Sequence, residues 1–500
     1  MQTSTKAGVA GTLGVLAILG LPLLDPLTRA RFINDWVIIW GFPLLLIVII
    51  GVAVLAALAM KKTGATILIG ILGIGGLIFY ANARDYNTKL EYASTVHISN
   101  DPMPGLKERA PFLVAERQAS SNLSGINGQI GGTDYLADSN HYSTIVDRKG
   151  NFNPGYAAII NQTIQLTGQA SGKPCLFDEK NAHRRMDGWF HNSLTRAIAA
   201  KDSLLIAKKD DAWGYCDGDT PKIVVPVTKL NGWINPVHRP AGVAIYDGRT
   251  GNVEIRDEVR AGDLPGPAVA LSYVQRVNDS LATHNGGWWS MVQGQSGLTD
   301  EVKDANDPNQ GNHSAFSLAY KDAPGSVYAS PFTSRASSRS IEDVALLESG
   351  HVKAGESPSV TLYHLEVPRQ SNAATADKIK ADYSSLNGWA TGLSVQEVIP
   401  VSHDEWAASI GLNQNVVYRV QVKADGSSCL ANADGEKIRC IDKDGKSAGT
   451  DGTQTTGSSD AGETPTGPAA EIGTLSNEDL AKLQDAVTQE VLKRLSAAKQ

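Results

Sequence analysis

The sequence predicts an α+β protein anchored in a membrane. Its expected parts are N-terminal transmembrane helices, about three, then a large mixed extracytoplasmic region with mainly antiparallel sheets, a disordered linker and a C-terminal amphipathic helix. Three observations predict this. Residues 8–81 of the 500-residue chain are almost wholly apolar, residues 85–443 have the composition of a globular protein, and residues 444–474 have almost no apolar side chains.

Three apolar runs occupy residues 8–24, 36–60 and 64–83. A bilayer core of about 30 Å needs about 20 helical residues, so the second and third runs are long enough to span it. The first run is marginal, and three alternatives stay open for it: a span, a re-entrant segment or a cleaved signal peptide. Only a few residues, among them Lys61 and Lys62, separate the long runs, so we expect a tight antiparallel hairpin.

The charges beside these runs predict the topology. Under the positive-inside rule the Lys61–Lys62 pair faces the cytoplasm, which places everything after Arg84 outside. Arg29 and Arg31 then also lie outside, a mild departure from the rule. We therefore expect a multi-pass protein of the cell membrane, with the large region and the C-terminus on the extracytoplasmic side.

Four cysteines lie in the large region. The Asp-Gly dipeptide between Cys429 and Cys440 favours a two-residue hairpin turn, and counting outward from it sets these cysteines opposite each other. Cys175 and Cys216 form the second pair by elimination. Two disulfides favour an oxidising compartment, because thiols stay reduced in the cytosol.

The composition predicts a division of the chain after the membrane region, residues 1–84. The expected parts are a stalk or irregular segment at 85–140, a first α+β part at 141–356, a second at 357–443, a flexible linker at 444–474 and a helix at 475–500.

Short β-branched runs predict strands in the first part. Lys222–Thr228 is expected at a sheet edge or strand end because Pro226 interrupts it. Residues 241–246 and 252–256 flank a turn and predict a hairpin. Residues 268–284 carry apolar side chains on one helical face, and the Gly- and Asn-rich stretch 120–138 is expected to be loop.

The second part shows a clearer alternation of elements. A capping-box pattern at Ser402 and Glu405 predicts a short helix that ends near Gly411. The other expected elements are a strand at 360–367, a helix at 372–386 with Asn372 at its start, and strands at 395–399 and 416–422.

The C-terminal helix has an apolar stripe that could dock on a partner protein or mediate self-association. The alternative is that the helix packs on its own domain. The stripe consists of Leu480, Leu483, Val487, Val491 and Leu495.

Composition and motifs exclude several function classes. A net charge of −7 without a basic stripe argues against nucleic acid as a partner. No P-loop or dinucleotide fingerprint is present, so we expect no cofactor. The long apolar runs contain no ionisable residue to line a path, which disfavours a transporter.

Four short patterns are weak candidates for chemistry. Gly445–Gly449 matches G-x-S-x-G but lies in the expected linker, and Asp442-x-Asp444 lacks the other ligands of a calcium loop. His183–His191 (HRRMDGWFH) is an anion- or metal-site candidate that more often is a helix surface. His284 with Trp288–Trp289 is a sugar-stacking candidate that more often is core packing.

These observations favour a non-enzymatic protein that is anchored in the lipid bilayer and belongs to a larger membrane assembly. It would bind a protein or a component of the cell envelope. The alternative is an envelope hydrolase acting on peptide or glycan. Its site would combine dispersed Asp or Glu with histidines, namely His183, His191, His238 and His284.

Overall fold

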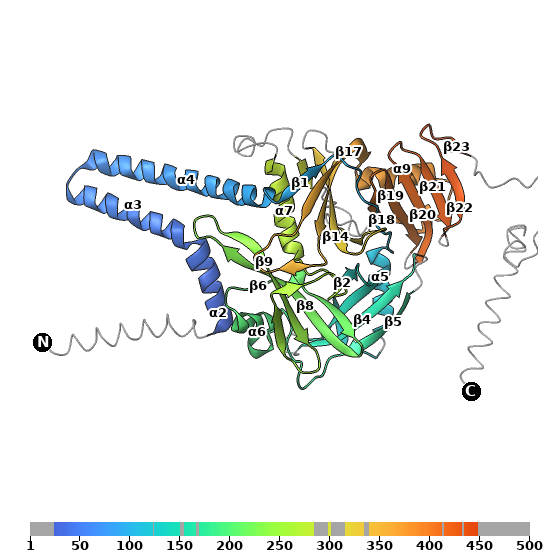
Figure 1. The fold of residues 1–500 in the computed structure, drawn as a ribbon, viewed down its shortest axis with the longest axis horizontal. Helices are drawn as coiled ribbons and strands as arrows, with labels where there is room; N and C mark the ends of the chain where they lie inside the picture. Colours follow the sequence, from blue (N-terminus) through green and yellow to red (C-terminus); the bar gives the residue numbers. More distant parts are fainter. Residues whose placement is uncertain are drawn as a thin grey trace, which may run out of the picture. The chain divides into compact units, whose positions relative to one another are not determined.

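The computed structural model describes residues 25–448, apart from 124, 151–154, 167–169, 285–298, 302–315, 335–339, 413–414 and 433–434. Its helices alternate with antiparallel strands along the chain (Figure 1). The helical elements are α2 (Pro26–Arg31), the π-helix η1 (Phe32–Ile39), α3 (Gly41–Ala59), α4 (Thr63–Ala93), α5 (Phe112–Ser121), η2 (Phe190–Asn192), α6 (Leu194–Lys201), η3 (Lys209–Asp211), α7 (Leu271–His284), α9 (Asn372–Asp382) and η4 (Trp389–Thr391).

The strands form five sheets in the described part of the chain, and of their pairings only β1 with β17 is parallel. One sheet has the order β1-β17-β15-β14-β12, with β13 also on β14, and a second runs β10-β9-β8-β6, with β7 also on β8. The others are β2-β3-β4-β5, β18 to β23 in sequence order, and β11-β16.

The strand bounds follow the hydrogen-bonded ladders. They are β1 (Val96–Ser99), β2 (Gly128–Leu136), β3 (His141–Arg148), β4 (Tyr156–Ile164), β5 (Ala170–Leu176), β6 (Ile206–Ala207), β7 (Trp213–Asp217), β8 (Thr220–Asn231), β9 (Val237–Asp247), β10 (Val253–Arg256), β11 (Glu258–Val259), β12 (Thr299–Glu301), β13 (Phe316–Ala319), β14 (Ser326–Ser334), β15 (Ser340–Glu348), β16 (Val352–Lys353), β17 (Val360–Gln370), β18 (Leu393–Ser402), β19 (Glu405–Leu412), β20 (Asn415–Lys423), β21 (Ser428–Asn432), β22 (Lys437–Ile441) and β23 (Ser447–Ala448). A mainly antiparallel α+β fold is therefore confirmed.

The three largest apolar cores hold most of the sheets together. The first packs β13 to β15 and α9 against β18 to β22, and the second packs α7 between β8–β9 and β14–β17. The third lies between β4–β5 and β8–β9 and includes α6. The apolar face expected on α7 is confirmed, because Val269, Tyr273, Val277 and Leu281 are almost fully buried.

Two helices are long and apolar enough to cross a membrane, α3 and α4. They run antiparallel beside each other, and the expected hairpin at Lys61–Lys62 is present (Figure 1). The first apolar run, 8–24, lies outside the described residues. The helix α4 continues ten residues beyond the expected end at Ala83, because Asp85 and Lys89 form an ion pair of 2.9 Å and Ala93 is buried.

Four local expectations were wrong, and each has a physical reason. Within 120–138 the glycines mark a closely packed strand, not a loop: a Cβ at Gly128 would lie 2.3 Å from Val146 Cγ1 of the neighbouring strand. The strand that contains Pro226, β8, lies inside its sheet and not at the edge. The sheet tolerates the missing N–H of Pro226 because the β8–β9 ladder shifts register between Pro226 and Thr228.

The other two errors concern helix starts. Ser402 and Glu405 do not cap a helix; they face each other across a tight turn, and Glu405–Leu412 continues as β19. In α9 the capping side chain belongs to Ser371, whose Oγ accepts from the N–H of Ala374 at 3.3 Å, and the helix ends at Asp382.

The chain divides into two compact units, residues 1–450 and 451–500. The first unit runs from the candidate spans to the last described strand. Within the expected linker, residues 444–448 are described and form the turn before β23 and β23 itself. The rest of the linker and the apolar stripe of the C-terminal helix lie outside the described residues.

Candidate functional site

The membrane hairpin presents an almost continuous apolar surface. Leu55, Ile71 and Phe79 are each more than 60% exposed, which is unfavourable in water and natural in lipid. The two helices approach closely at Gly73, where a Cβ would lie 2.6 Å from Ile50 Cγ2. Small residues at such contacts let membrane helices pack backbone to backbone.

The tip of the β8–β9 hairpin fastens the base of these helices to the sheets. Trp233 Nε1 donates to the carbonyl of Val37 at 2.9 Å, and Tyr80 Oη donates to the carbonyl of Ile234 at 2.8 Å. Arg84 Nη1 donates to the carbonyl of Ile39 at 2.7 Å, which links α4 to η1, the π-helix that precedes α3. The acceptor in each of these bonds is a backbone carbonyl. Because the backbone moves less than a side chain, the bonds hold the helical segment in place relative to the β8–β9 loop.

The segment α2–η1 also contacts the sheet region. Asp25 pairs with Arg196 of α6 at 2.9 Å, and Asn34 Nδ2 donates to the carbonyl of Ser203 at 3.4 Å. The Thr28 N–H and hydroxyl donate to the carboxylate of Asp25, and with Arg196 these bonds outweigh burial and lower its pKa. If α3 and α4 both cross the bilayer, this segment and the sheets lie on the same side.

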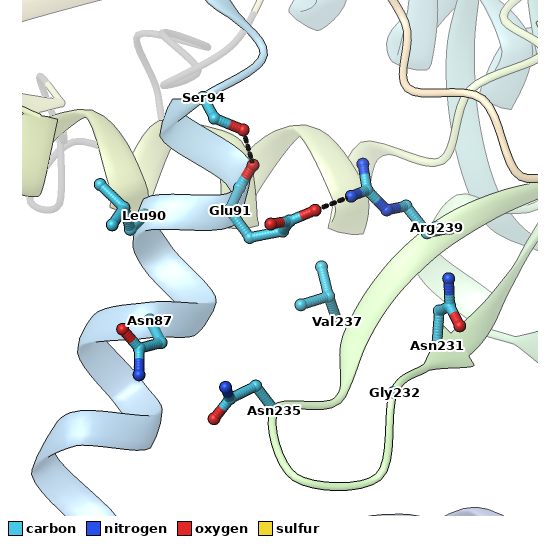
Figure 2. Close-up of a pocket in the computed structure, with 9 residues that line it drawn as sticks. All are labelled: Asn87, Leu90, Glu91, Ser94, Asn231, Gly232, Asn235, Val237 and Arg239. Carbon is cyan, nitrogen blue, oxygen red and sulfur yellow. Dashed lines mark hydrogen bonds and ion pairs between the residues drawn. The ribbon is translucent and has the colours of Figure 1, made fainter.

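A polar groove of 670 Å³ opens between the C-terminal turns of α4 and the β8–β9 hairpin (Figure 2). One wall comes from α4 and the other from the hairpin. The lining residues are Asn87, Leu90, Glu91, Ser94, Asn231, Gly232, Asn235, Val237 and Arg239.

One ion pair crosses the groove. The guanidinium of Arg239 contacts the carboxylate of Glu91 (Figure 2). It also donates to Ser357 Oγ. The side-chain amides of Asn87 and Asn235 have no hydrogen-bond partner among the described residues. Free amides both donate and accept, so the groove can bind a neutral polar chain such as a peptide backbone.

A neutral histidine stands behind the groove. Burial and the nearby cations Arg276 and Lys208 lower the pKa of His238 to about 3. Its Nδ1 lies 3.1 Å from Thr228 Oγ1, and its backbone N–H donates to Tyr92 Oη at 2.8 Å. The backbone of His238 thus fastens β9 to α4, while its imidazole contacts Thr228 of β8. The described lining of the groove contains no histidine.

Disulfides join the two cysteine pairs that the sequence suggests. Cys175 of β5 bonds Cys216 of β7 and so connects two sheets, with their Cα atoms 6.0 Å apart. Cys429 and Cys440 face each other in β21 and β22. Ile438 has no partner in the ladder: Ala431 pairs with Lys437, and Leu430 pairs with Arg439. Because of this irregularity, Cys429 and Cys440 pair as predicted.

The HRRMDGWFH segment is mostly loop, and only its last two residues belong to a helical element, the short 3-10 helix η2. The rings of His183 and His191 lie 5.8 Å apart, while Arg184 Nη1 donates to the carbonyl of Gly251 at 2.8 Å. No group of three or more metal-ligating side chains occurs in the described part of the chain. The structure thus gives these side chains local contacts with the loop and with the β9–β10 turn.

The remaining patterns are placed in part. Asp442 Oδ1 accepts the backbone N–H groups of Asp444 and Lys446, so this carboxylate shapes a turn. Of the G-x-S-x-G pattern, Ser447 lies in the edge strand β23, and the residues from 449 onward lie outside the described part of the chain. Trp288 and Trp289 lie outside the described residues, as does the side chain of His284.

Sequence reasoning missed the groove. Glu91 and Arg239 are far apart in the sequence, and no periodic pattern connects them. One local signal was available: the turn Asn231–Pro236 carries Trp233 and Ile234, both about half exposed, among turn-forming residues. Apolar side chains at a hairpin tip indicate a contact with another element or with lipid.

Comparisons with known proteins assign no family to this chain. No protein-family model, no curated protein and no solved structure matches the sequence.

Proposed function

We propose that this protein is a membrane-anchored extracytoplasmic binding protein without a catalytic role. Its groove beside the membrane receives a polar juxtamembrane segment of a partner protein in a larger assembly. The observation that carries the proposal is that one continuous helix, α4, is both a candidate span and a wall of the groove.

The helix sets the height of the groove above the bilayer. Phe79 and Tyr80 close the apolar part of α4, as aromatic residues do at the headgroup level. With a rise of about 1.5 Å per residue, Asn87 stands about 10 Å and Ser94 about 20 Å beyond Tyr80. The headgroup layer is only several ångströms thick, so the groove opens where a partner's chain leaves the membrane.

The two disulfides support the extracytoplasmic placement, because such bonds persist in oxidising compartments. The Lys61–Lys62 turn at the far end of the hairpin supports the same orientation. Protease added to intact cells stripped of any outer layer should therefore digest the sheet region and leave a membrane-protected hairpin. Complete protection of the sheet region would contradict this orientation.

Crosslinking in native membranes tests the groove. We expect a photo-crosslinking residue at position 87 to give one discrete adduct, and one at position 377, an exposed site on α9, to give none. The variant Asn235→Ala should weaken the adduct while Asp377→Ala leaves it unchanged. Equal labelling from both positions, or a monodisperse lone protein with hydrolytic activity, would overturn the proposal.

A further inference from the structure

A second cavity, of 240 Å³, lies away from the groove, where α5, β2 and the start of α7 meet β14. It adjoins a cavity of 260 Å³, with which it shares Thr133, Asp134 and Asp210. Its lining residues are Phe112, Glu116, Thr133, Asp134, Tyr135, Asp210, Asp211, Trp213, Pro267, Leu271, Gln275, Ser317 and Tyr328.

The charges of this lining have one sign. Four carboxylates face the cavity, and none of its described lining residues is Lys or Arg. Asp211 is already engaged, because it accepts from the N–H of Ser272 at 2.7 Å and from its hydroxyl at 2.6 Å. Asp134 and Asp210 have no hydrogen-bond or ion-pair partner among the described residues. The cavity therefore has unused acceptor capacity and negative charge.

The phenol of Tyr328 is a second, independent observation. Its side chain is only 7% exposed and lines the cavity, and its hydroxyl has no hydrogen-bond partner in the described part of the chain. The hydroxyl is therefore accessible to a molecule bound in the cavity. Burial together with Asp134 and Asp211 raises the pKa of Tyr328, so the phenol stays neutral and can accept a hydrogen bond from a bound donor.

Aromatic rings form much of the remaining wall. Trp213 Nε1 is committed to the carbonyl of Pro267 at 2.9 Å, and Tyr135 Oη donates to Asn140 Oδ1 at 2.8 Å. The rings of Phe112 and Tyr135 already face the guanidinium of Arg109, whose Cζ lies 4.4 and 5.5 Å from their centroids. The indole of Trp213 therefore offers more of the available ring surface. Ring faces beside carboxylates attract organic cations, through the quadrupole of the ring and the charge of the acid.

We propose that this cavity binds an organic cation: a primary ammonium or a guanidinium carried on an alkyl stem. Asp134 and Asp210 would neutralise its charge, Tyr328 would accept one of its N–H bonds, and the rings would cover the stem. The shared chemistry has two sources, a lysine or arginine side chain of a peptide and a free alkylamine. The site is independent of the groove and of its proposed partner.

The test uses the full chain in detergent or nanodiscs. Saturation-transfer NMR with n-butylammonium, n-butylguanidinium and the neutral n-butanol measures binding, while 1,5-diaminopentane and N-acetyl-lysine methylamide separate the free amine from the peptide side chain. We expect both cations to bind and n-butanol not to. Loss of a charge-assisted hydrogen bond should make Asp134→Asn weaken binding at least about tenfold.

Two further variants keep the test independent of folding. Glu116→Gln changes an exposed side chain at the cavity and should weaken binding severalfold, while Asp377→Asn on α9 should leave binding unchanged. The proposal is overturned if n-butanol binds as well as the cations, if folded Asp134→Asn binds like the wild type, or if Ca²⁺ displaces the cations at submillimolar concentration.

Discussion

The isolated carboxylate of Asp134 should reduce the stability of the free protein at neutral pH. Burial without a compensating partner raises its pKa from 3.8 to about 7. Between these pH values the folded state holds a proton that the unfolded state releases, so this group's contribution to stability is complete below pH 3.8 and is lost as pH rises through 7. A shift of this size corresponds to about 4 kcal/mol.

Asn is nearly isosteric with protonated Asp and cannot ionise. Asp134→Asn should therefore match the wild type near pH 4 and exceed its free energy of unfolding by up to about 4 kcal/mol at pH 8. Glu116, Asp147 and Asp211 also have pKa values raised by burial, but they are present in both proteins and largely cancel in the difference.

Urea unfolding of the full chain in detergent, with the disulfides intact and circular dichroism as the signal, measures this difference at several pH values. Asp377→Asn controls for the removal of an exposed charge. A difference that does not change between pH 4 and pH 8, or an Asp134→Asn variant that is less stable at pH 8, would refute the reasoning.

Three further predictions concern the hairpin, a buried ion pair and a disulfide. Gly73→Leu should loosen the α3–α4 pair and lower thermal stability in nanodiscs, whereas Gly76→Leu, with open space around it, should not. Glu397→Gln should cost about 3–5 kcal/mol in urea unfolding, because it leaves the buried guanidinium of Arg109 without its counter-charge; an effect under about 1 kcal/mol would contradict this. Cys175→Ser should lower the free energy of unfolding by about 3 kcal/mol and make the interface between the two sheets accessible to limited proteolysis. An unchanged digestion pattern would show that the disulfide does not hold the two sheets together.

The sequence predicted most where a pattern is local. Apolar length predicted α3 and α4, two short runs flanking a turn predicted the β9–β10 hairpin, and an Asp-Gly turn predicted the register of Cys429 with Cys440. Prediction failed where a local signal has two meanings. The glycine-rich stretch that contains β2 has the composition of a loop, but at Gly128 and Gly131 side chains of the neighbouring strand leave no room for a Cβ.

Neither binding site could be predicted from the sequence. The groove depends on Glu91 meeting Arg239, and the acidic cavity depends on Asp134 and Tyr328, which lie on different sheets. Contacts of this kind depend on how whole sheets pack against each other, so they produce no recognisable spacing or periodicity in the sequence. A polar residue within a strand, such as Asp134, gives only the weak indication that it faces either solvent or a partner.

The contrast with a second buried charge argues that the acidic cavity is built for binding. Arg109 and Glu397 are almost fully buried and satisfy each other through two bonds of 2.7 and 2.8 Å, with Tyr142 Oη 3.2 Å from the guanidinium. Asp134 and Tyr328, on the other hand, have no such partners among the described residues. A bound ammonium or guanidinium would supply the missing donors and charge, and would reverse the pKa shift of Asp134. Binding should therefore strengthen as pH rises from 5 to 8, and binding that weakens over this range would show that another group holds the cation.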